Sequence, residues 1–197
     1  MAPERAADRA RPDRPGRLAR ERPPQPLTPG AYRTGVTALI LASASPARLA
    51  TLRAAGIEPE VIVSNVDESV VDASDPAELC GTLARLKAEA VAAQVGRPAL
   101  VLGCDSVLAF DGAILGKPAD AADATRRWQR MRGRHGVLHT GHCVIDTATG
   151  KRAAATSATT VHFAEVTDAE IDAYVASGEP LRVAGAFTID GLGSPFV

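Results

Sequence analysis

Short apolar runs and stretches of helical periodicity alternate along most of the chain. The run Thr37–Ala42 predicts a buried strand, because its apolar residues are consecutive over the length of a strand. A helix is predicted directly after it, with Ser45 as N-cap and Pro46 at the first helical position. A longer helix is predicted over Pro76–Val95. Its expected apolar stripe consists of Leu79, Leu83, Leu86 and Ala90. Ordered structure is therefore expected to begin at Thr37.

The rest of the chain continues the alternation of strand and helix patterns. Strands are predicted at Glu60–Ser64, Ala99–Gly103, His135–Ile145 and Lys151–Phe163, and helices at Asp120–Met131 and Thr167–Ala176. In the last of these helices, Thr167 and Glu170 have the spacing of a capping box. The helix before it should direct Ala124, Trp128 and Met131 inward.

The stretch Pro98–Pro118 places two charged residues close together in the predicted fold. Asp105 is expected just past the carboxyl end of its strand, where open α/β sheets place their ligand sites. Asp111-Gly112 predicts a type I′ hairpin, which returns the chain to Lys117. A carboxylate and an ammonium group close together at one edge of the sheet could hold a metal or activate water beside an anionic substrate. The alternative is an Asp that forms a turn and a Lys that is merely solvated.

Residues 43–48 form a second candidate site at the start of a helix. Free backbone N–H groups and the positive end of the helix dipole favour a phosphate at this position. Arg48, one turn into the helix, could add a bidentate contact. Many serine-rich turns between a strand and a helix bind nothing, and that alternative stays open.

Three further charged residues have two possible interpretations each. Asp67 and Glu68 follow a predicted strand and would either coordinate a metal or lie in a solvated loop. Lys87 lies beside the apolar stripe of the long helix. Its alternative interpretation is a surface lysine whose aliphatic stem covers apolar surface.

Charge and cysteine content limit the partners and the cellular compartment that can be expected. Residues 1–35 hold eight arginines and four acids, with almost no large apolar residue, which predicts a disordered basic extension. That extension could bind nucleic acid or a membrane, or be dispensable. The remainder is mildly acidic, so no nucleic-acid partner is expected. No apolar run reaches the length of a membrane span, and three dispersed cysteines indicate a reducing cytoplasm.

The order of several motifs carries a resemblance to a known family. These motifs are Leu41–Pro46 with Arg48, Val66–Glu68, Lys87, Asp105, Gly116–Pro118, Thr140–Gly141, Ala184–Gly185 and Ile189–Gly191. Over residues 36–197 the chain resembles the Maf family of nucleoside triphosphate pyrophosphatases. The resemblance implies an α/β fold similar to that of Maf and inosine triphosphatase proteins, with a mixed twisted sheet, flanking helices and a cleft. It also implies a cytoplasmic enzyme that hydrolyses a nucleoside triphosphate to the monophosphate and pyrophosphate with a divalent cation, Mg²⁺ or Mn²⁺. Some members act on non-standard or modified nucleotides.

The resemblance, together with the chemistry of each side chain, assigns roles to single residues. Asp105 would be the base or metal ligand that activates water, and Glu68 would help to hold the cation. The substrate phosphates would be bound by Ser43, Ser45, Arg48, Lys87 and Lys117. Three positions that distinguish the base in the family depart from its usual patterns: Ala47, Ser106 and Asp190. The preferred base is therefore left open. The chain also stops before the family's usual closing Gly-Leu-Pro segment and last helix, so the domain is expected to be shortened at its C-terminus.

Two other functions remain open. One is a non-catalytic nucleotide-binding regulator of cell division that keeps the cleft without turnover. The other is a metal-dependent phosphatase or a nucleotidyl-handling enzyme of another kind. Homodimerisation is a further expectation that the sequence leaves open.

Overall fold

The structure is a computed structural model that describes residues 37–197. The expected basic extension, residues 1–35, lies outside the described residues. The strands are β1 (Ala38–Leu41), β2 (Glu60–Val61), β3 (Ala99–Phe110), β4 (Ala113–Leu115), β5 (His135–Asp146) and β6 (Arg152–His162). The helices are α1 (Pro46–Ala54), α2 (Pro76–Ala92), α3 (Ala121–Met131) and α4 (Asp168–Ala176). Short 3₁₀ turns cover Glu68–Val70, Pro180–Arg182, Ala184–Ala186 and Ser194–Phe196.

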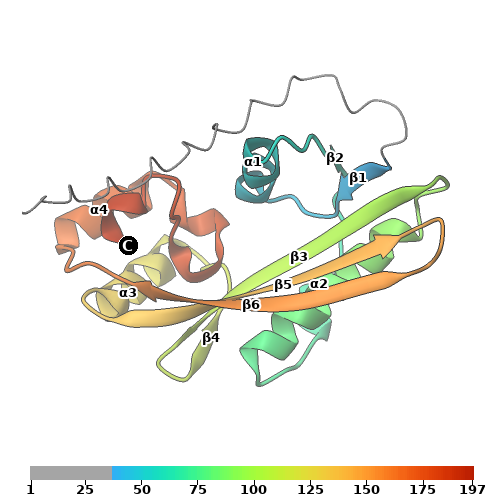
Figure 1. Ribbon diagram of the computed structural model, residues 1–197. Helices are drawn as coiled ribbons and strands as arrows, with labels where there is room; N and C mark the ends of the chain where they lie inside the picture. Colours follow the sequence, from blue (N-terminus) through green and yellow to red (C-terminus); the bar gives the residue numbers. More distant parts are fainter. Residues whose placement is uncertain (1–36) are drawn as a thin grey trace, which may run out of the picture. The chain divides into compact units, whose positions relative to one another are not determined.

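Within residues 37–197 the six strands form one mixed sheet, in the order β2-β1-β3-β5-β6, with β4 paired to the end of β3 (Figure 1). β1 is parallel to β2 and β3, whereas β5 and β6 follow as antiparallel neighbours. The prediction of an α/β fold with a mixed sheet and flanking helices is confirmed. None of the helices in this part of the chain combines the length and apolarity of a membrane span.

Local capping signals placed several elements correctly. The side chain of Ser45 accepts a hydrogen bond from Arg48 N, and α1 begins at Pro46 as predicted. The capping box of Thr167 and Glu170 is present at the start of α4. The β3–β4 hairpin turns at Asp111 and Gly112, whose φ angles of 55° and 76° are those of a type I′ turn. The strand predicted at Glu60–Ser64 is shorter in the structure, where β2 covers only Glu60–Val61.

One edge of β3 is interrupted in its middle. β5 pairs with β3 from Leu100 to Ala109 along one edge. On the other edge β1 pairs with Ala99–Leu102 and β4 with Leu108–Phe110, so residues 103–107 have no strand partner there within the described part of the chain. The prediction that the strand ends before Asp105 was wrong, since the ladder to β5 carries β3 through this position. Asp105 nevertheless lies just beyond the parallel pairing with β1.

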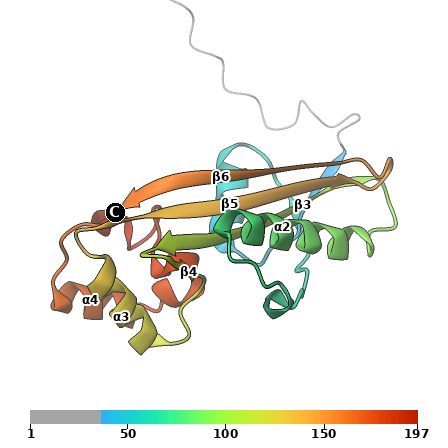
Figure 2. The same cartoon turned by 90° about the horizontal axis from the view of Figure 1, so that it is seen from below.

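Helix α2 lies along one face of β3 and β5 (Figure 2). Its buried residues are Cys80, Leu83, Ala84, Lys87, Ala88 and Val91. Only Leu83 of the predicted apolar stripe is among them. The difference follows from close approach, because a Cβ on Gly103 would lie 2.1 Å from Ala84 O, and one on Gly141 would lie 2.2 Å from Cys80 O. Small helix residues therefore face the sheet, and Lys87 enters the interface with them.

Substitution of Gly103 tests this close approach. Gly103→Ala is expected to lower the free energy of unfolding by about 1–3 kcal/mol, because the new methyl group would meet helix backbone that must move away. Chemical denaturation would measure the change. Gly96→Ala is the matched control, since a Cβ at Gly96 has no atom of the described chain within 4 Å. Equal stability of the two variants would contradict the tight contact between α2 and the sheet.

A hydrophobic cluster joins α3 and α4 to the carboxyl-terminal ends of β3 and β6. Trp128 is at its centre and makes edge-to-face contacts with Phe163, Tyr174 and Phe196. As predicted, Ala124, Trp128 and Met131 are the buried residues of α3. The indole N–H of Trp128 donates to Ala186 O at 2.7 Å. This cluster thereby fixes the C-terminal segment against the sheet.

Candidate active site

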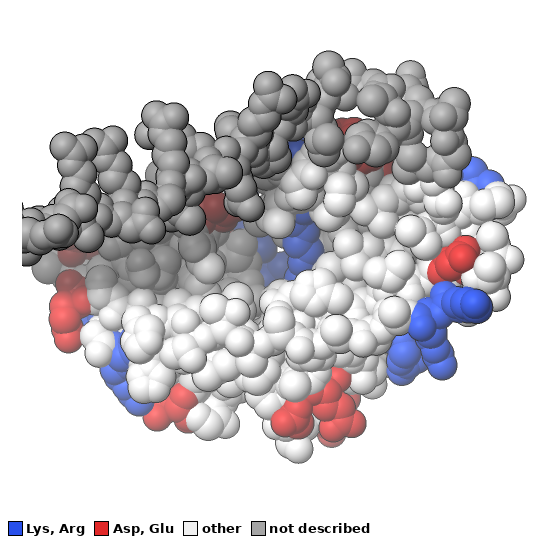
Figure 3. Space-filling model, viewed as in Figure 1, with Lys and Arg blue, Asp and Glu red and all other residues white. Residues whose placement is uncertain are grey.

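A cleft of about 1410 Å³ opens beside the interrupted edge of β3. Its lining comes from the end of β1, the start of α1, residues 63–73, α2, the middle of β3 and β5, the segment after β4 and residues 181–190. In the view of Figure 1, Lys and Arg side chains lie inside a hollow of this face (Figure 3). The cleft contains every residue to which the sequence assigned a site role: Ser43, Ser45, Ala47, Arg48, Glu68, Lys87, Asp105, Ser106, Lys117 and Asp190.

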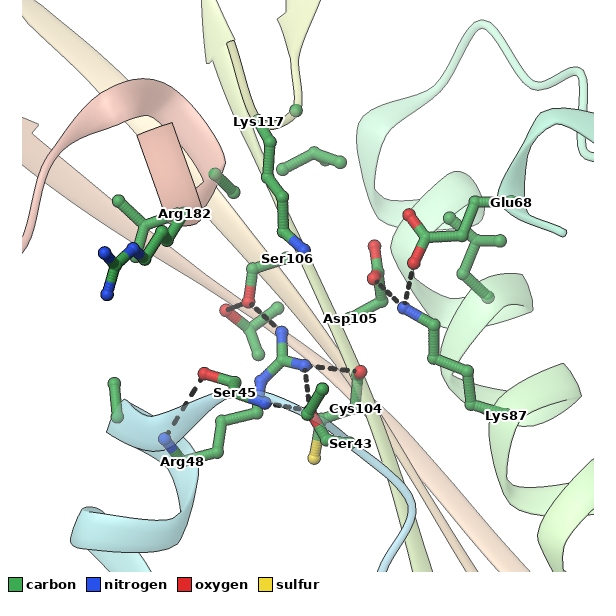
Figure 4. A pocket seen from close by; sticks show the side chains of 18 of the residues that line it. Ser43, Ser45, Arg48, Glu68, Lys87, Cys104, Asp105, Ser106, Lys117 and Arg182 are labelled. Carbon is green, nitrogen blue, oxygen red and sulfur yellow. Dashed lines mark hydrogen bonds and ion pairs between the residues drawn. The ribbon is translucent and has the colours of Figure 1, made fainter. Parts of the chain in front are cut away.

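The first cluster in the cleft is centred on Arg48 (Figure 4). Its Nη1 donates to Ser43 Oγ at 2.9 Å and to Cys104 O at 2.8 Å, and its Nη2 donates to Ser106 Oγ at 3.1 Å. Ser106 Oγ lies 3.0 Å from Thr140 Oγ1 on β5. Arg48 thus satisfies a carbonyl on the interrupted edge of β3 and ties α1 to the sheet. A guanidinium has five N–H donors, so donors remain for a ligand.

The serine turn before α1 is ordered by its own side chains. Ser43 is 7% exposed, and its Oγ accepts from the Ser45 N–H at 3.2 Å. The Ser45 N–H, which the sequence suggested for phosphate, is therefore engaged within the turn. Binding of a phosphate by Ser43 and Ser45 stays a prediction.

The second cluster joins α2, β3 and the 3₁₀ turn that starts at Glu68. Lys87 Nζ donates to Asp105 Oδ1 at 2.5 Å and lies 2.7 Å from Glu68 Oε1 (Figure 4). Lys87 and Asp105 are each 7% exposed, whereas Glu68 is exposed. Lys87 is consequently not a surface lysine, and that alternative was wrong. Its ammonium group compensates a carboxylate that the fold holds away from water.

Burial sets the protonation behaviour of Asp105. Loss of hydration raises the pKa of this carboxyl above its ordinary value, while the hydrogen bond and charge of Lys87 oppose the rise. The nearby Glu68 carboxylate adds to the increase. A carboxylate with a raised pKa is a stronger base than a solvated aspartate, as general-base chemistry near neutral pH requires.

Two exposed cations lie in the cleft beyond these clusters. Lys117 follows β4, and Arg182 ends the 3₁₀ turn after α4 (Figure 4). Neither makes an ion pair with a carboxylate of residues 37–197 at 4.0 Å or less. Sequence reasoning did not select Arg182. The sequence signal that could have identified Arg182 was its position three residues before Gly185, next to the Ala184–Gly185 motif.

The carboxylates can supply only part of a metal site. Among residues 37–197 no group of three or more His, Cys, Asp or Glu side chains could hold a metal ion. Asp105 and Glu68 face one another across the Lys87 ammonium and are oxygen donors, the kind that Mg²⁺ prefers. Mg²⁺ commonly binds through one or two carboxylates plus substrate phosphates, so Asp105 and Glu68 could supply protein ligands through the oxygens that Lys87 does not contact.

Cations around a buried carboxylate, in a cleft with the start of a helix at one side, define a site for a polyanionic ligand. Comparison of the sequence identifies the group of proteins to which this site belongs. The chain belongs to the Maf family, because the family model described as Maf-like protein matches residues 38–197.

Relatives within this family are similar over most of their length. A protein of Salinispora tropica is 66% identical over 164 residues, which are 81% of this chain and 72% of the relative. A protein of Streptomyces coelicolor is 62% identical over 160 residues, 81% of this chain and 78% of the relative. Both are named nucleoside triphosphate pyrophosphatase. The structure of a HAM1 protein from Coxiella burnetii has a TM-score of 0.43 at 19% identity, covering 78% of this chain and 88% of that one, and adds nothing to the assignment.

Proposed function

We propose that this chain hydrolyses a nucleoside triphosphate to the monophosphate and pyrophosphate. Membership of the Maf family and the names of the two relatives support this reaction. The observation that carries the proposal is the buried contact of Lys87 with Asp105 in a cleft that also holds Arg48, Lys117 and Arg182. Such a site can hold a charged polyphosphate beside a base.

In the proposed mechanism Asp105 accepts a proton from the attacking water. The water oxygen forms a bond to the α-phosphorus, the bond from that phosphorus to the bridging oxygen breaks, and pyrophosphate leaves. Phosphoryl transfer depends mainly on positioning and on charge stabilisation. Lys117 and Arg182 would bind the phosphates, because neither is engaged by a carboxylate of the described residues. Lys87 would keep Asp105 ionised, and Arg48 would hold the turn before α1 in place. The binding of phosphates by Arg48, through its remaining donors, and by Lys87 stays part of the proposal.

We propose that a divalent cation, Mg²⁺ or Mn²⁺, takes part and that Asp105 and Glu68 hold it together with phosphate oxygens. When bound, such a cation would supply additional charge neutralisation at the phosphates. Chelation of divalent cations is expected to abolish turnover, and addition of Mg²⁺ or Mn²⁺ should restore it.

Other parts of the cleft would determine which nucleobase the protein prefers. Ala47, Ser106 and Asp190 would determine the base preference, and non-standard or modified nucleotides are among the proposed substrates. The Ser106 side chain is already hydrogen-bonded to Arg48 and to Thr140, whereas Asp190 is exposed in the cleft. We also propose that the protein acts in the cytoplasm, in keeping with its three free thiols. A homodimer is a further proposal, which light scattering would test.

A panel of standard and modified nucleoside triphosphates with Mg²⁺ or Mn²⁺ tests the proposed reaction. We expect equal amounts of monophosphate and pyrophosphate and no orthophosphate. Release of orthophosphate would identify a phosphatase instead. Nucleotide binding without release of either product would favour the non-catalytic regulator.

A further inference from the structure

The segment that carries Lys117 is held by side chains of α3. Arg127 Nη1 donates to Gly116 O at 2.7 Å, and Nη2 lies 3.5 Å from Lys117 O. Asp123 lies 2.7 Å from Arg127 Nη2 and accepts from the N–H of Ala119 at 3.1 Å. The Arg127 side chain is 15% exposed and its hydrogen bond to Gly116 O is partly buried, whereas its longer contact with Lys117 O is open to water. Arg127 and Asp123 thus clamp the backbone on both sides of Lys117.

The same clamp is joined to a second segment of the cleft lining, residues 181–190. Gly116 O also accepts from the N–H of Gly185 at 3.1 Å. Trp128, the residue after Arg127, donates to Ala186 O at 2.7 Å. Gly185 and Ala186 have φ angles of 71° and 61°, a backbone conformation that needs support at the alanine. Consecutive residues of α3 therefore hold the Lys117 segment and the segment that leads to Asp190.

We propose that Arg127 is a positioning residue that sets the location of the Lys117 ammonium in the cleft. This inference rests on the proposed function, in which Lys117 binds a substrate phosphate. The side chain of lysine is flexible, so the place its ammonium can reach depends on how firmly its backbone is fixed. The Lys117 carbonyl is one of the two carbonyls that Arg127 contacts. Lysine at position 127 could not replace arginine, because a single ammonium lacks the fork that spans two carbonyls and a carboxylate.

A double-mutant cycle of Arg127→Met and Lys117→Ala tests the inference on hydrolysis of the fastest triphosphate of the panel. In the wild-type background Arg127→Met should lower kcat/KM about tenfold, mainly through KM, because ground-state binding of the phosphate is lost. In the Lys117→Ala background it should have almost no further effect, since the residue through which it acts is gone. The same loss in both backgrounds, or no loss in either, would overturn the proposal.

Two controls separate positioning from general damage. Arg130→Met, also on α3 but exposed and paired with Asp111 outside the cleft, should leave KM unchanged. If Arg127→Met does not fold, Arg127→Gln keeps one amide donor for a carbonyl, and the same cycle is run with it.

Binding of inorganic pyrophosphate, measured by calorimetry in the four proteins of the cycle, gives a readout without turnover. Wild-type protein that neither hydrolyses triphosphates nor binds pyrophosphate would contradict the proposed function itself. Wild-type activity with an additive cycle would contradict the role of Arg127 alone.

Discussion

Asp105→Asn is expected to lower the rate of triphosphate hydrolysis by about 10²–10⁴-fold, the usual contribution of a general base. Asparagine keeps the shape of the side chain and can still contact neighbouring polar groups, but it cannot accept the proton of the attacking water. The Lys87 ammonium would lose the negative charge of the partner that lies 2.5 Å away and retain only the exposed Glu68 as an anionic partner. Steady-state release of pyrophosphate would measure the loss, and nucleotide binding should change much less than kcat.

Asp111→Asn provides the matched control for this substitution. Asp111 is exposed at the tip of the β3–β4 hairpin with a φ of 55°, a conformation that asparagine tolerates well. Its variant should therefore keep both fold and activity. Hydrolysis by Asp105→Asn within a few-fold of wild type would remove Asp105 from the chemistry.

Lys87→Met is expected to produce the second large effect, on both activity and stability. Without Lys87, only the charge of Arg48 still opposes the effect of burial, so the pKa of Asp105 should rise further than in the wild-type protein. Activity requires the ionised carboxylate, so the acidic limb of the pH dependence of kcat/KM should move to higher pH. Lys87→Arg keeps the charge and should leave that limb closer to the wild-type position.

The stability of Lys87→Met should depend on pH in the opposite direction to its activity. A carboxyl with a raised pKa in the folded state favours folding below its unfolded pKa, and this contribution is lost as pH rises through the folded pKa. At pH values where Asp105 is ionised, the unpaired buried charge should cost about 3–5 kcal/mol of unfolding free energy. Chemical denaturation at several pH values measures this trend.

A second substitution provides the control for that stability effect. Lys87→Met combined with Asp105→Asn should recover most of the lost stability, because no buried charge remains. Lys151→Met, at an exposed lysine in the β5–β6 turn, should show no such dependence on pH. Stability of Lys87→Met that is independent of pH would contradict a buried ion pair.

Local sequence signals were sufficient for the parts of the fold that local chemistry determines. The cap at Ser45 with Pro46, the Asp111-Gly112 turn and the capping box at Thr167 each act over a few residues, and the structure contains all three. The set of residues in the cleft also came from the sequence, because the order of the motifs identified the family before the fold was known.

The wrong or missing predictions concern contacts between segments that are far apart in the sequence. Asp105 interrupts an apolar run, so the sequence suggested a strand end, but pairing with β5 continues the strand through it. The face of α2 that is buried depends on Gly103 of β3 and Gly141 of β5, which allow the helix backbone to come close. Helical periodicity alone favoured burial of the leucines of α2. The clamp of Arg127 on Gly116 and Lys117 likewise depends on how α3 packs, which no spacing in the sequence indicates.

The phosphorus atom that water attacks distinguishes the proposed pyrophosphatase from a phosphatase. Hydrolysis of the preferred triphosphate in water enriched in ¹⁸O, followed by mass spectrometry of the products, shows which phosphorus the water attacks. Attack at the α-phosphorus, as proposed for water activated by Asp105, predicts one ¹⁸O atom in the monophosphate and none in pyrophosphate. Heavy oxygen in pyrophosphate or in released orthophosphate would contradict the proposed reaction.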